Sequence, residues 1–263
     1  MARELNRRQI HRALNKSLLE KHWRDTMNWQ TMKTTLITGA NRGIGLELCR
    51  QYAADGWRVL ACSRMPEKSD ALNRLAAQYP GLVTLNALDV GDIVQIERLA
   101  QDLADISIDL LVNNAGIYPD SDKKGFGHTD YADWAQAFRI NTMATLKMAE
   151  TFVRQISGSK QKSIVTITSK MASIADNRGG GSYLYRTSKV AVNMVVKSLS
   201  IDLQKLGITA VVFHPGWVKT DMGGQNAMIS AEQSVSGMRQ VIGSLTLADS
   251  GKFFAYDGQE IPW

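Results

Sequence analysis

Residues 35–45 read TLITGANRGIG, an apolar run followed by a glycine-rich turn, and this stretch decides the fold. Glycines after a buried strand allow a tight turn, a close approach of the backbone to a pyrophosphate, and close packing of the next helix on the strand. The N-terminus of that helix points its N–H groups and its dipole at phosphate. The spacing is GxxxGxG rather than the commoner GxGxxG, so the glycines could also serve only to ease a turn. Either way, the stretch predicts a strand, a turn and a helix.

From Lys33 onward, short apolar runs alternate with helical patterns, which is typical of repeated strand–helix units and a parallel sheet. We expect strands at residues 33–38, 57–62, 82–87, 108–113, 162–168, 208–213 and 251–255. We expect helices at residues 43–55, 67–78, 92–104, 130–156, 183–205 and 230–243. No proline-rich linker or low-complexity segment divides them. Residues 32–263 are therefore predicted to form one α/β domain, a Rossmann-type doubly wound parallel β-sheet of about seven strands flanked by helices.

The net charge of +6 lies mostly outside this domain, because residues 1–31 hold seven basic and three acidic side chains, a net +4. We expect this segment to be a disordered or artificially added extension. It has no apolar core of a secretion signal, and its acidic residues argue against an organellar transit peptide. The nearly balanced domain predicts no nucleic-acid partner. Binding of nucleic acid or membrane through residues 1–31 is the alternative, and it would be salt-sensitive.

Several other partners and locations are disfavoured by composition. No apolar run reaches the roughly 18 residues that a membrane-spanning helix needs, so we expect no membrane partner. The two cysteines, Cys49 and Cys62, lack a metal-ligand spacing and fit a reducing, cytoplasmic location. None of the four histidines stands in a metal-ligand arrangement, so we expect no metal.

Tyr185 and Lys189 lie four residues apart within a predicted helix, so both side chains project from one face of that helix. A nearby ammonium favours the phenolate form of tyrosine, which can turn the phenol into a usable acid. The spacing alone is weak, because many surface helices carry a tyrosine and a lysine four residues apart by chance.

Six motifs in a fixed order strengthen this interpretation. They are TGxxxGIG at 38–45, Asn113-Asn114-Ala115-Gly116, Asn141, Ser169, YxxxK at 185–189, and PGWVKT at 215–220. In this order they resemble the short-chain dehydrogenase/reductase family over nearly all of residues 33–263. The long interval from Ser169 to Tyr185 and the C-terminal GKFFAYDGQEIPW resemble the branch of C-factor and the sniffer-type carbonyl reductases.

The resemblance implies four catalytic residues. Tyr185 would be the general acid or base for a carbonyl or alcohol oxygen. Lys189 would lower the pKa of that phenol and hold the nicotinamide ribose, and Ser169 would hydrogen-bond the substrate carbonyl. Asn141 would interrupt its helix and hold a water that links Lys189 to solvent, although an exposed asparagine in a helix is the alternative.

The resemblance also implies a set of residues around the dinucleotide. Two of its members have a simple structural alternative: Asn113 could only end a strand, and Asp89 could cap the helix that follows. The implied cofactor-binding residues are Gly39, Asn41, Arg42, Gly43, Ile44, Gly45, Ser63, Arg64, Asp89, Val90, Asn113, Ala115, Gly116, Tyr185, Lys189, Pro215, Gly216, Val218 and Thr220.

The end of the second predicted strand, LACSR at 60–64, indicates which dinucleotide binds. An NAD site usually has an acidic residue there, which accepts the ribose hydroxyls and repels a 2′-phosphate. This chain has Ser63 instead, followed by Arg64, and Arg42 lies in the glycine-rich turn. Two guanidinium groups could bind the 2′-phosphate, so NADP(H) is favoured over NAD(H). Alternatively, either arginine could simply face solvent.

The substrate pocket is predicted to be mostly apolar. Its expected residues are Ser169, Tyr118, Trp217 and Met222, with residues 217–230 as a mobile lid, or else as an ordinary surface loop. This predicts a hydrophobic aldehyde, ketone or quinone as the small-molecule substrate. A dinucleotide-binding signalling protein of C-factor type, with little or no turnover, is the alternative function. The apolar helix after Tyr185 predicts a homodimer or homotetramer.

Overall fold

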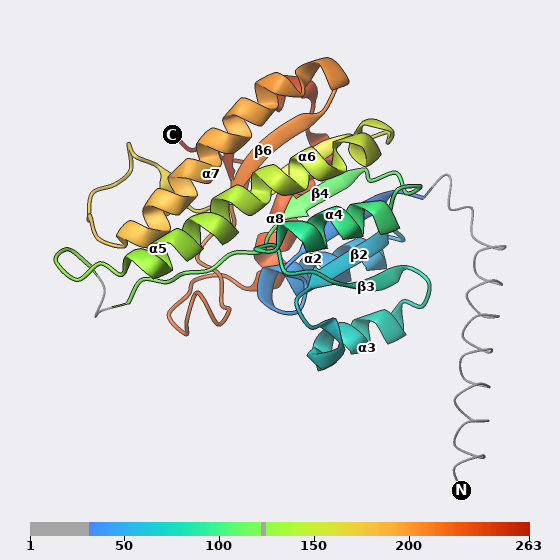
Figure 1. The fold of residues 1–263 in the computed structure, drawn as a ribbon, viewed down its shortest axis with the longest axis horizontal. Helices are drawn as coiled ribbons and strands as arrows, with labels where there is room; N and C mark the ends of the chain where they lie inside the picture. The colour runs from blue at the N-terminus through green and yellow to red at the C-terminus, as the bar shows by residue number, and fades with distance from the viewer. Residues whose placement is uncertain (1–31, 122–124) are drawn as a thin grey trace, which may run out of the picture.

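The computed structural model describes residues 32–121 and 125–263, which form one α/β domain (Figure 1). The extension expected at residues 1–31 lies outside the described residues. The strands are β1 (Thr34–Thr38), β2 (Arg58–Ser63), β3 (Val83–Ala87), β4 (Leu110–Asn113), β5 (Ser163–Ile167), β6 (Thr209–His214) and β7 (Phe253–Ala255). The α-helices are α2 (Gly43–Ala54), α3 (Asp70–Gln78), α4 (Ile93–Asp102), α5 (Tyr131–Phe138), α6 (Ala144–Ser157), α7 (Tyr183–Asp202) and α8 (Ala231–Ser244).

The strands form a single sheet in the order β3-β2-β1-β4-β5-β6-β7, and each neighbouring pair is parallel. Strand order reverses between β1 and β4, which is the point where doubly wound folds bind ligands, beyond the carboxyl ends of the strands. Every residue of β1 and of β5 is buried, as expected of parallel strands covered on both faces. The predicted doubly wound parallel sheet is confirmed.

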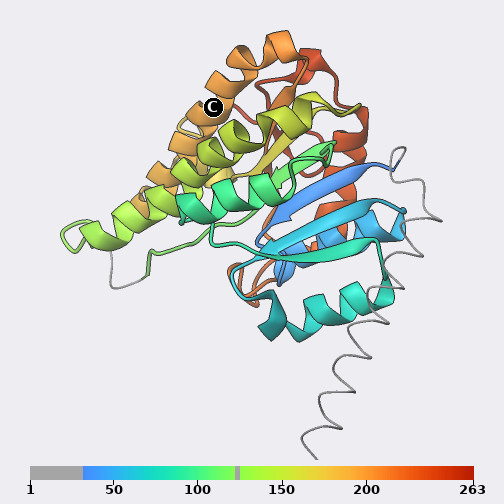
Figure 2. The same cartoon turned by 45° about the vertical axis from the view of Figure 1, so that its right-hand side comes forward.

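Helices cover both faces of the sheet (Figures 1 and 2). On one face, α4, α6 and α7 pack their apolar sides against alternate strand residues such as Leu36 and Leu111. On the other face, α2, α3 and α8 pack against the intervening residues, such as Ile37. Burying each of these large aliphatic side chains contributes about 1.5–3 kcal/mol. The two cores hold the strand ends, and therefore the loops that follow them, in fixed positions.

The helix expected at residues 130–156 is interrupted. A π-helical turn at Arg139–Met143 separates α5 from α6. Contacts from outside the helix accompany this turn, because Asn141 bonds the backbone of Ile117 and Thr142 Oγ1 donates to the backbone oxygen of Ser188 at 2.8 Å. Such π-turns recur at functional sites.

Other expected elements differ only at their ends. The last strand begins at Phe253 rather than at 251, since Gly251 turns the chain with a φ of +82°. The helix expected at 67–78 divides into a short 3-10 turn and α3, which Ser69 caps by accepting from the backbone N–H of Leu72. Within the described residues no helix has both the length and the apolar character needed to cross a bilayer.

At the amino ends of the strands, the buried carboxylate of Asp109 joins three chain segments. Its Oδ2 accepts from Thr34 N at 2.9 Å, and its Oδ1 accepts from Lys160 N at 3.2 Å and Gln161 N at 3.3 Å. Asp109 thereby ties the start of β1 to the segment that leads into β5, on the opposite edge from the site described next.

Candidate active site

The carboxyl ends of β1, β4, β5 and β6 bring the predicted motifs to one edge of the sheet. At the end of β1, Gly39 and Gly43 adopt φ values of +65° and +54°, which side chains with a Cβ rarely adopt. A Cβ on Gly45 would lie 2.2 Å from the backbone oxygen of Gly39, so only glycine fits there. Ile44 lies in the first turn of α2 and packs against the core.

The glycine-rich turn is fixed by the neighbouring β4 turn. Thr38 Oγ1 accepts from the backbone N–H groups of Asn114 and Ala115, both at 3.0 Å. The side chain of Asn114 donates to the backbone oxygens of Thr38 at 2.8 Å and Gly39 at 3.2 Å. On the other side, Ser69 Oγ donates to the backbone oxygen of Asn41 at 3.1 Å. Polar contacts on both sides therefore fix the backbone conformation of the glycine-rich turn.

Ser63 and Arg64 end β2 beside this turn. Ser63 is 5% exposed, and its Oγ is buried without a hydrogen-bond partner among the described residues. Arg64 is exposed. No carboxylate occupies either position, as the sequence indicated.

Asp89 and Val90 follow β3, and the structure rules out one of the two roles weighed for Asp89. The cap of α4 is Asp92, whose Oδ1 accepts from Val94 N at 3.0 Å and Gln95 N at 3.2 Å. Asp89 instead accepts from Gly91 N at 2.9 Å in a local turn. The helix-cap interpretation of Asp89 is therefore wrong.

Asn113 and Gly116 connect the β4 turn to the centre of the site. Asn113 is buried at the end of β4, and neither atom of its side-chain amide has a hydrogen-bond partner among the described residues. A Cβ on Gly116 would lie 3.1 Å from Asn141 Oδ1 and 3.4 Å from Lys189 Nζ. Gly116 thus lets the backbone pass directly beside these two side chains.

Tyr185 and Lys189 lie on the buried side of α7 and are 8% and 4% exposed. Lys189 Nζ donates to the backbone oxygen of Ile167 at 2.8 Å and lies 5.8 Å from the centre of the Tyr185 ring. Ser169 lies two residues beyond β5, and its side chain hydrogen-bonds Tyr185. The three side chains predicted to be catalytic are therefore neighbours.

The pKa values of this group differ from what the sequence predicted. Burial raises the pKa of Tyr185 to about 12, the Ser169 hydrogen bond partly opposes this rise, and nearby Tyr118 adds to it. Burial lowers the pKa of Lys189 from its ordinary 10.5 to about 8. In the protein by itself the Tyr185 pKa is thus raised and not lowered, because desolvation by burial is the largest cause of its shift.

Asn141 lies in the π-helical turn and is 2% exposed, so the alternative of an exposed helical asparagine is wrong. Its Oδ1 accepts from Ile117 N at 2.8 Å, and its Nδ2 donates to Ile117 O at 3.0 Å and Ser188 Oγ at 2.9 Å. The side chain thus joins the β4 loop to α7. The water between Asn141 and Lys189 stays a prediction.

Of the residues expected to face the substrate, Tyr118 packs against Tyr185. Their ring centres lie 4.7 Å apart, and the rings are tilted by 51° to each other. Trp217 and Met222 are 50% and 53% exposed on the segment after β6, and Trp217 Nε1 donates to Gly223 O at 2.8 Å. The segment closes on itself through a bridge between Val218 and Ile229.

The start of this segment reaches the glycine-rich turn. Ser234 Oγ donates to the backbone oxygen of Pro215, and Gly216 turns the chain with a φ of +84°. Thr220 then passes over Gly43, where its Cγ2 would lie 3.1 Å from an added Cβ. Beside it, Arg42 forms an exposed ion pair with Asp221 at 2.7 Å.

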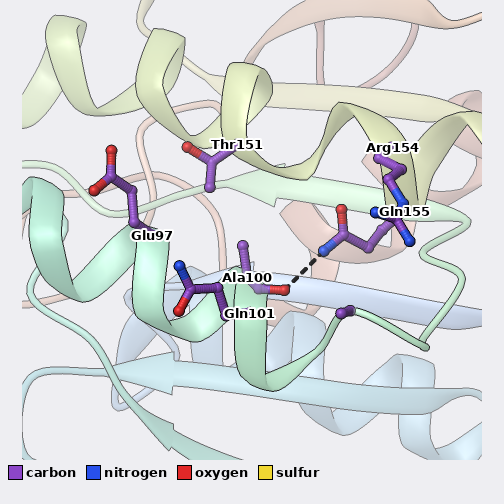
Figure 3. Close-up of a pocket in the computed structure, with 7 residues that line it drawn as sticks. Glu97, Ala100, Gln101, Thr151, Arg154 and Gln155 are labelled. Carbon is purple, nitrogen blue, oxygen red and sulfur yellow. Dashed lines mark hydrogen bonds between the residues drawn. The ribbon is translucent and has the colours of Figure 1, made fainter.

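A separate cavity of about 310 Å³ lies between α4 and α6 (Figure 3). It is lined by Glu97, Gln101 and Arg154 among others, and the Gln155 amide donates across it to the backbone oxygen of Ala100 at 3.0 Å. None of the predicted site residues lines it. Among residues 32–121 and 125–263, no group of three histidine, cysteine or acidic side chains could hold a metal ion.

Three residues at the site were not anticipated from the sequence. Asn114 was quoted within a motif but not assigned to the site, although its side chain holds the glycine-rich turn. Asp120 and Asp221 contact site residues that are 65 and 179 positions away in the chain. No local pattern predicts such distant pairs.

The arrangement fits a dinucleotide. Gly45 lets the start of α2 pack directly against the backbone of Gly39, and α2 begins there without a side-chain cap on its first N–H groups. Ser63 Oγ has no hydrogen-bond partner in the described part of the chain and ends the second strand, where dinucleotide-binding folds hold the adenosine ribose. The residues present would therefore hold the phosphates and the adenosine ribose of a nicotinamide dinucleotide.

Comparison with known proteins agrees with this geometry. A family model for short chain dehydrogenases matches residues 33–228. The C-signal protein of Myxococcus xanthus is 43% identical over 156 residues, which cover 59% of this chain and 93% of that protein. The carbonyl reductase Sniffer of D. melanogaster has a TM-score of 0.82 at 30% identity, covering 88% of this chain and 100% of Sniffer. An NADPH-bound carbonyl reductase from chicken fatty liver has a TM-score of 0.80 at 32% identity, covering 88% and 99%.

The matched region runs from β1 through the segment after β6, so it contains the glycine-rich turn, Tyr185 and Lys189. The resemblance to the C-factor and sniffer-type branch is confirmed by the similarity to C-signal and to Sniffer. On the fold, the ordered motifs and the family match together, this chain is an oxidoreductase that belongs to the short-chain dehydrogenase family.

Proposed function

We propose that this protein is an NADP(H)-dependent carbonyl reductase that interconverts a hydrophobic aldehyde, ketone or quinone and its alcohol. The observation that carries the proposal is the buried group of Ser169, Tyr185 and Lys189 beside the glycine-rich turn. Tyr185 keeps its proton at neutral pH, and a bound carbonyl oxygen that gains negative charge would take that proton from it.

Each catalytic side chain has a distinct role in this proposal. Tyr185 donates its hydroxyl proton to the carbonyl oxygen, while Ser169 hydrogen-bonds the same oxygen as negative charge develops on it. Lys189 stabilises the phenolate that forms and holds the nicotinamide ribose. Asn141 keeps the β4 loop and α7 together around this group, and a water beside it would return a proton toward Lys189.

The bound nicotinamide would supply the hydride. We infer that the glycine-rich turn from Gly39 to Gly45 holds the pyrophosphate, while Asn113–Gly116, Asp89 and Val90 line the adenosine side. Pro215, Gly216, Val218 and Thr220 would adjoin the nicotinamide carboxamide. Preference for NADP(H) over NAD(H) is supported by Ser63, Arg64 and Arg42, and by the NADPH-bound relative from chicken.

The substrate class follows from the side chains expected to face the substrate. Tyr118 supplies an aromatic wall, and Trp217 and Met222 supply exposed apolar surface on residues 217–230. Closure of this segment as a lid over an apolar carbonyl compound would exclude water from the reaction.

The test is NADPH consumption, followed at 340 nm, with a panel of aldehydes, ketones and quinones, alongside NADPH binding by fluorescence. We expect turnover that is faster with NADPH than with NADH. Binding of NADPH with no turnover of any member of the panel would overturn the enzymatic proposal.

That same outcome would favour a second function. The 43% identity to C-signal makes a dinucleotide-binding signalling protein of C-factor type a specific alternative. In that case the purified protein, and equally a Tyr185→Phe variant, should act on a responding cell without consuming NADPH. The small-molecule substrate, the absence of a nucleic-acid or membrane partner, and the cytoplasmic location belong to the first proposal and stay predictions.

A further inference from the structure

The helix that carries Tyr185 begins without a local cap. Ser182 precedes α7 in a left-handed conformation, with a φ of +45°, and its side chain makes no hydrogen bond to the first turn. Serine at this position usually satisfies one of the free N–H groups of a helix. Here its hydroxyl pairs with the Tyr118 hydroxyl at 2.9 Å instead. The first turn of α7 therefore needs an acceptor from elsewhere.

Asp120 is that acceptor. Its Oδ2 accepts from Tyr185 N at 2.8 Å, and its Oδ1 accepts from Leu184 N at 3.3 Å. A carboxylate at this end of a helix also interacts favourably with the helix dipole. Asp120 lies in the loop after β4, so a residue 65 positions earlier holds the backbone of Tyr185 itself.

The four residues Ile117–Asp120 hold the site at three points. Ile117 is bonded through its N–H and its carbonyl to the Asn141 amide, and the Tyr118 ring packs at an angle against the Tyr185 ring. Asp120 makes the third contact, by accepting a hydrogen bond from the backbone N–H of Tyr185. The segment therefore fixes the distance between the π-helical turn and the start of α7.

We propose that Asp120 is a positioning residue for Tyr185: it caps α7 in place of Ser182 and so keeps the phenol against Ser169. This inference rests on the proposed role of Tyr185 as the proton donor. Losing the carboxylate frees two N–H groups in the turn that carries the phenol. The Tyr185 hydroxyl then leaves its hydrogen-bonded position, and a misplacement of about 1 Å can slow a reaction by about a hundred-fold.

The test compares Asp120→Ala with a matched control, Asp92→Ala. Asp92 caps α4 in the same way, with one carboxylate and two backbone N–H groups, and it touches none of the catalytic side chains. With NADPH saturating, we expect Asp120→Ala to lower kcat by about ten- to a hundred-fold and Asp92→Ala to leave it within about two-fold. Asp120→Asn keeps an acceptor oxygen, so its kcat should fall between those of Asp120→Ala and the unaltered protein.

A second measurement does not depend on turnover. Tyrosines labelled with ¹³C at the phenolic carbon are titrated by NMR, with the Tyr185 signal assigned by its loss in Tyr185→Phe. In Asp120→Ala the Tyr185 pKa should move from its burial-raised value back toward that of a free phenol, while in Asp92→Ala it should not move. The NMR titration tests the role of Asp120 even if the unaltered protein turns over no compound of the substrate panel. That absence of turnover would overturn the proposed function but not the role of Asp120.

Two results would overturn the role of Asp120. One is an unchanged kcat and an unchanged Tyr185 titration in a folded Asp120→Ala variant. The other is an equal loss of kcat in Asp120→Ala and Asp92→Ala, because that would reflect general destabilisation by a lost cap rather than positioning of Tyr185.

Discussion

At the scale of single residues, the proposed chemistry depends on the Tyr185 hydroxyl. Burial raises its pKa to about 12, so the phenol keeps its proton at neutral pH in the protein by itself. Ser169 is the neighbour that hydrogen-bonds this hydroxyl, and the Tyr118 ring covers one side of it.

Tyr185→Phe removes only this hydroxyl and keeps the ring. We expect kcat to fall by at least about a hundred-fold, as for the loss of a general acid, while the Kd for NADPH changes by less than about two-fold. Steady-state kinetics and fluorescence titration measure the two. The control is Tyr131→Phe, at an exposed tyrosine of α5, which should leave both unchanged. Activity that survives Tyr185→Phe would contradict the assignment.

The lowered pKa of Lys189 leads us to expect opposite effects of pH on activity and on stability. Its pKa in the folded protein, about 8, lies below the ordinary 10.5 because the ammonium is buried. Below about pH 8 the ammonium is present and active, but its burial destabilises the fold. Between about pH 8 and 10.5 the folded protein loses the proton first, so this cost disappears as the pH rises.

We therefore expect kcat/KM for NADPH to fall above about pH 8, while the contribution of Lys189 to the free energy of unfolding increases over the same range. Kinetics and urea denaturation between pH 7 and 10 check both. Lys189→Met should lack this gain in stability with pH, relative to the unaltered protein. If the unaltered protein and Lys189→Met gained the same stability between pH 7 and 10, the gain would come from groups other than Lys189.

At the scale of elements, the segment after β6 is joined to the glycine-rich turn. Thr220 passes over Gly43, and Asp221 pairs with Arg42, one of the two arginines proposed to bind the 2′-phosphate. The Arg42 and Asp221 side chains are 68% and 74% exposed, so their pairing is worth at most about 1 kcal/mol. Asp221 would thus compete with the phosphate for Arg42.

Asp221→Asn removes this competitor. We expect the Kd for NADPH to fall by about two- to five-fold at low salt, less at high salt, and the Kd for NADH to stay unchanged. Fluorescence titrations at two salt concentrations measure this, with Asp105→Asn at an exposed loop position as the control. Equal tightening of NADPH and NADH would exclude a role through the 2′-phosphate.

Elements that consist of buried apolar runs were predictable from the sequence. Features that depend on polar contacts between distant segments were not. The strands were predictable because parallel strands covered on both faces read as continuous apolar runs, such as Thr35-Leu36-Ile37. The break between α5 and α6 could not be predicted from the local sequence, since residues 139–143 contain no proline or glycine. It coincides with the Asn141–Ile117 bonds, and the cap by Asp120 is likewise a contact between segments far apart in the chain.

At the scale of the whole molecule, exposed apolar side chains collect on the helices that carry the site. Met143, Met194 and Ile201 are 60%, 66% and 63% exposed along the π-helical turn and α7. Leu199, on the same helix α7, is buried in the chain's own core. The exposed remainder still supports a homodimer or homotetramer.

A Met194→Asp, Ile201→Asp double variant should therefore shift to the mass of a single chain. Light scattering coupled to size exclusion measures this, and Val94→Asp on α4, also exposed, is the control that should leave the mass unchanged. A single-chain mass for the unaltered protein would refute the predicted assembly.

The last prediction concerns the edge of the sheet opposite the site. Asp109 accepts from three backbone N–H groups, of Thr34, Lys160 and Gln161, which would lose their partner in Asp109→Ala. An unsatisfied buried N–H group costs about 1–3 kcal/mol; Thr34 is buried, whereas Lys160 and Gln161 are more exposed, so we expect the free energy of unfolding to fall by about 3 kcal/mol in all. Asp109→Asn keeps an acceptor oxygen and should lose less. Denaturant titration measures both variants beside Asp105→Ala, an exposed control.

Because Asp109 lies at the opposite edge of the sheet from Tyr185, kcat per folded molecule should stay unchanged in Asp109→Ala. A loss of kcat in the folded variant would mean that the two edges of the sheet are coupled.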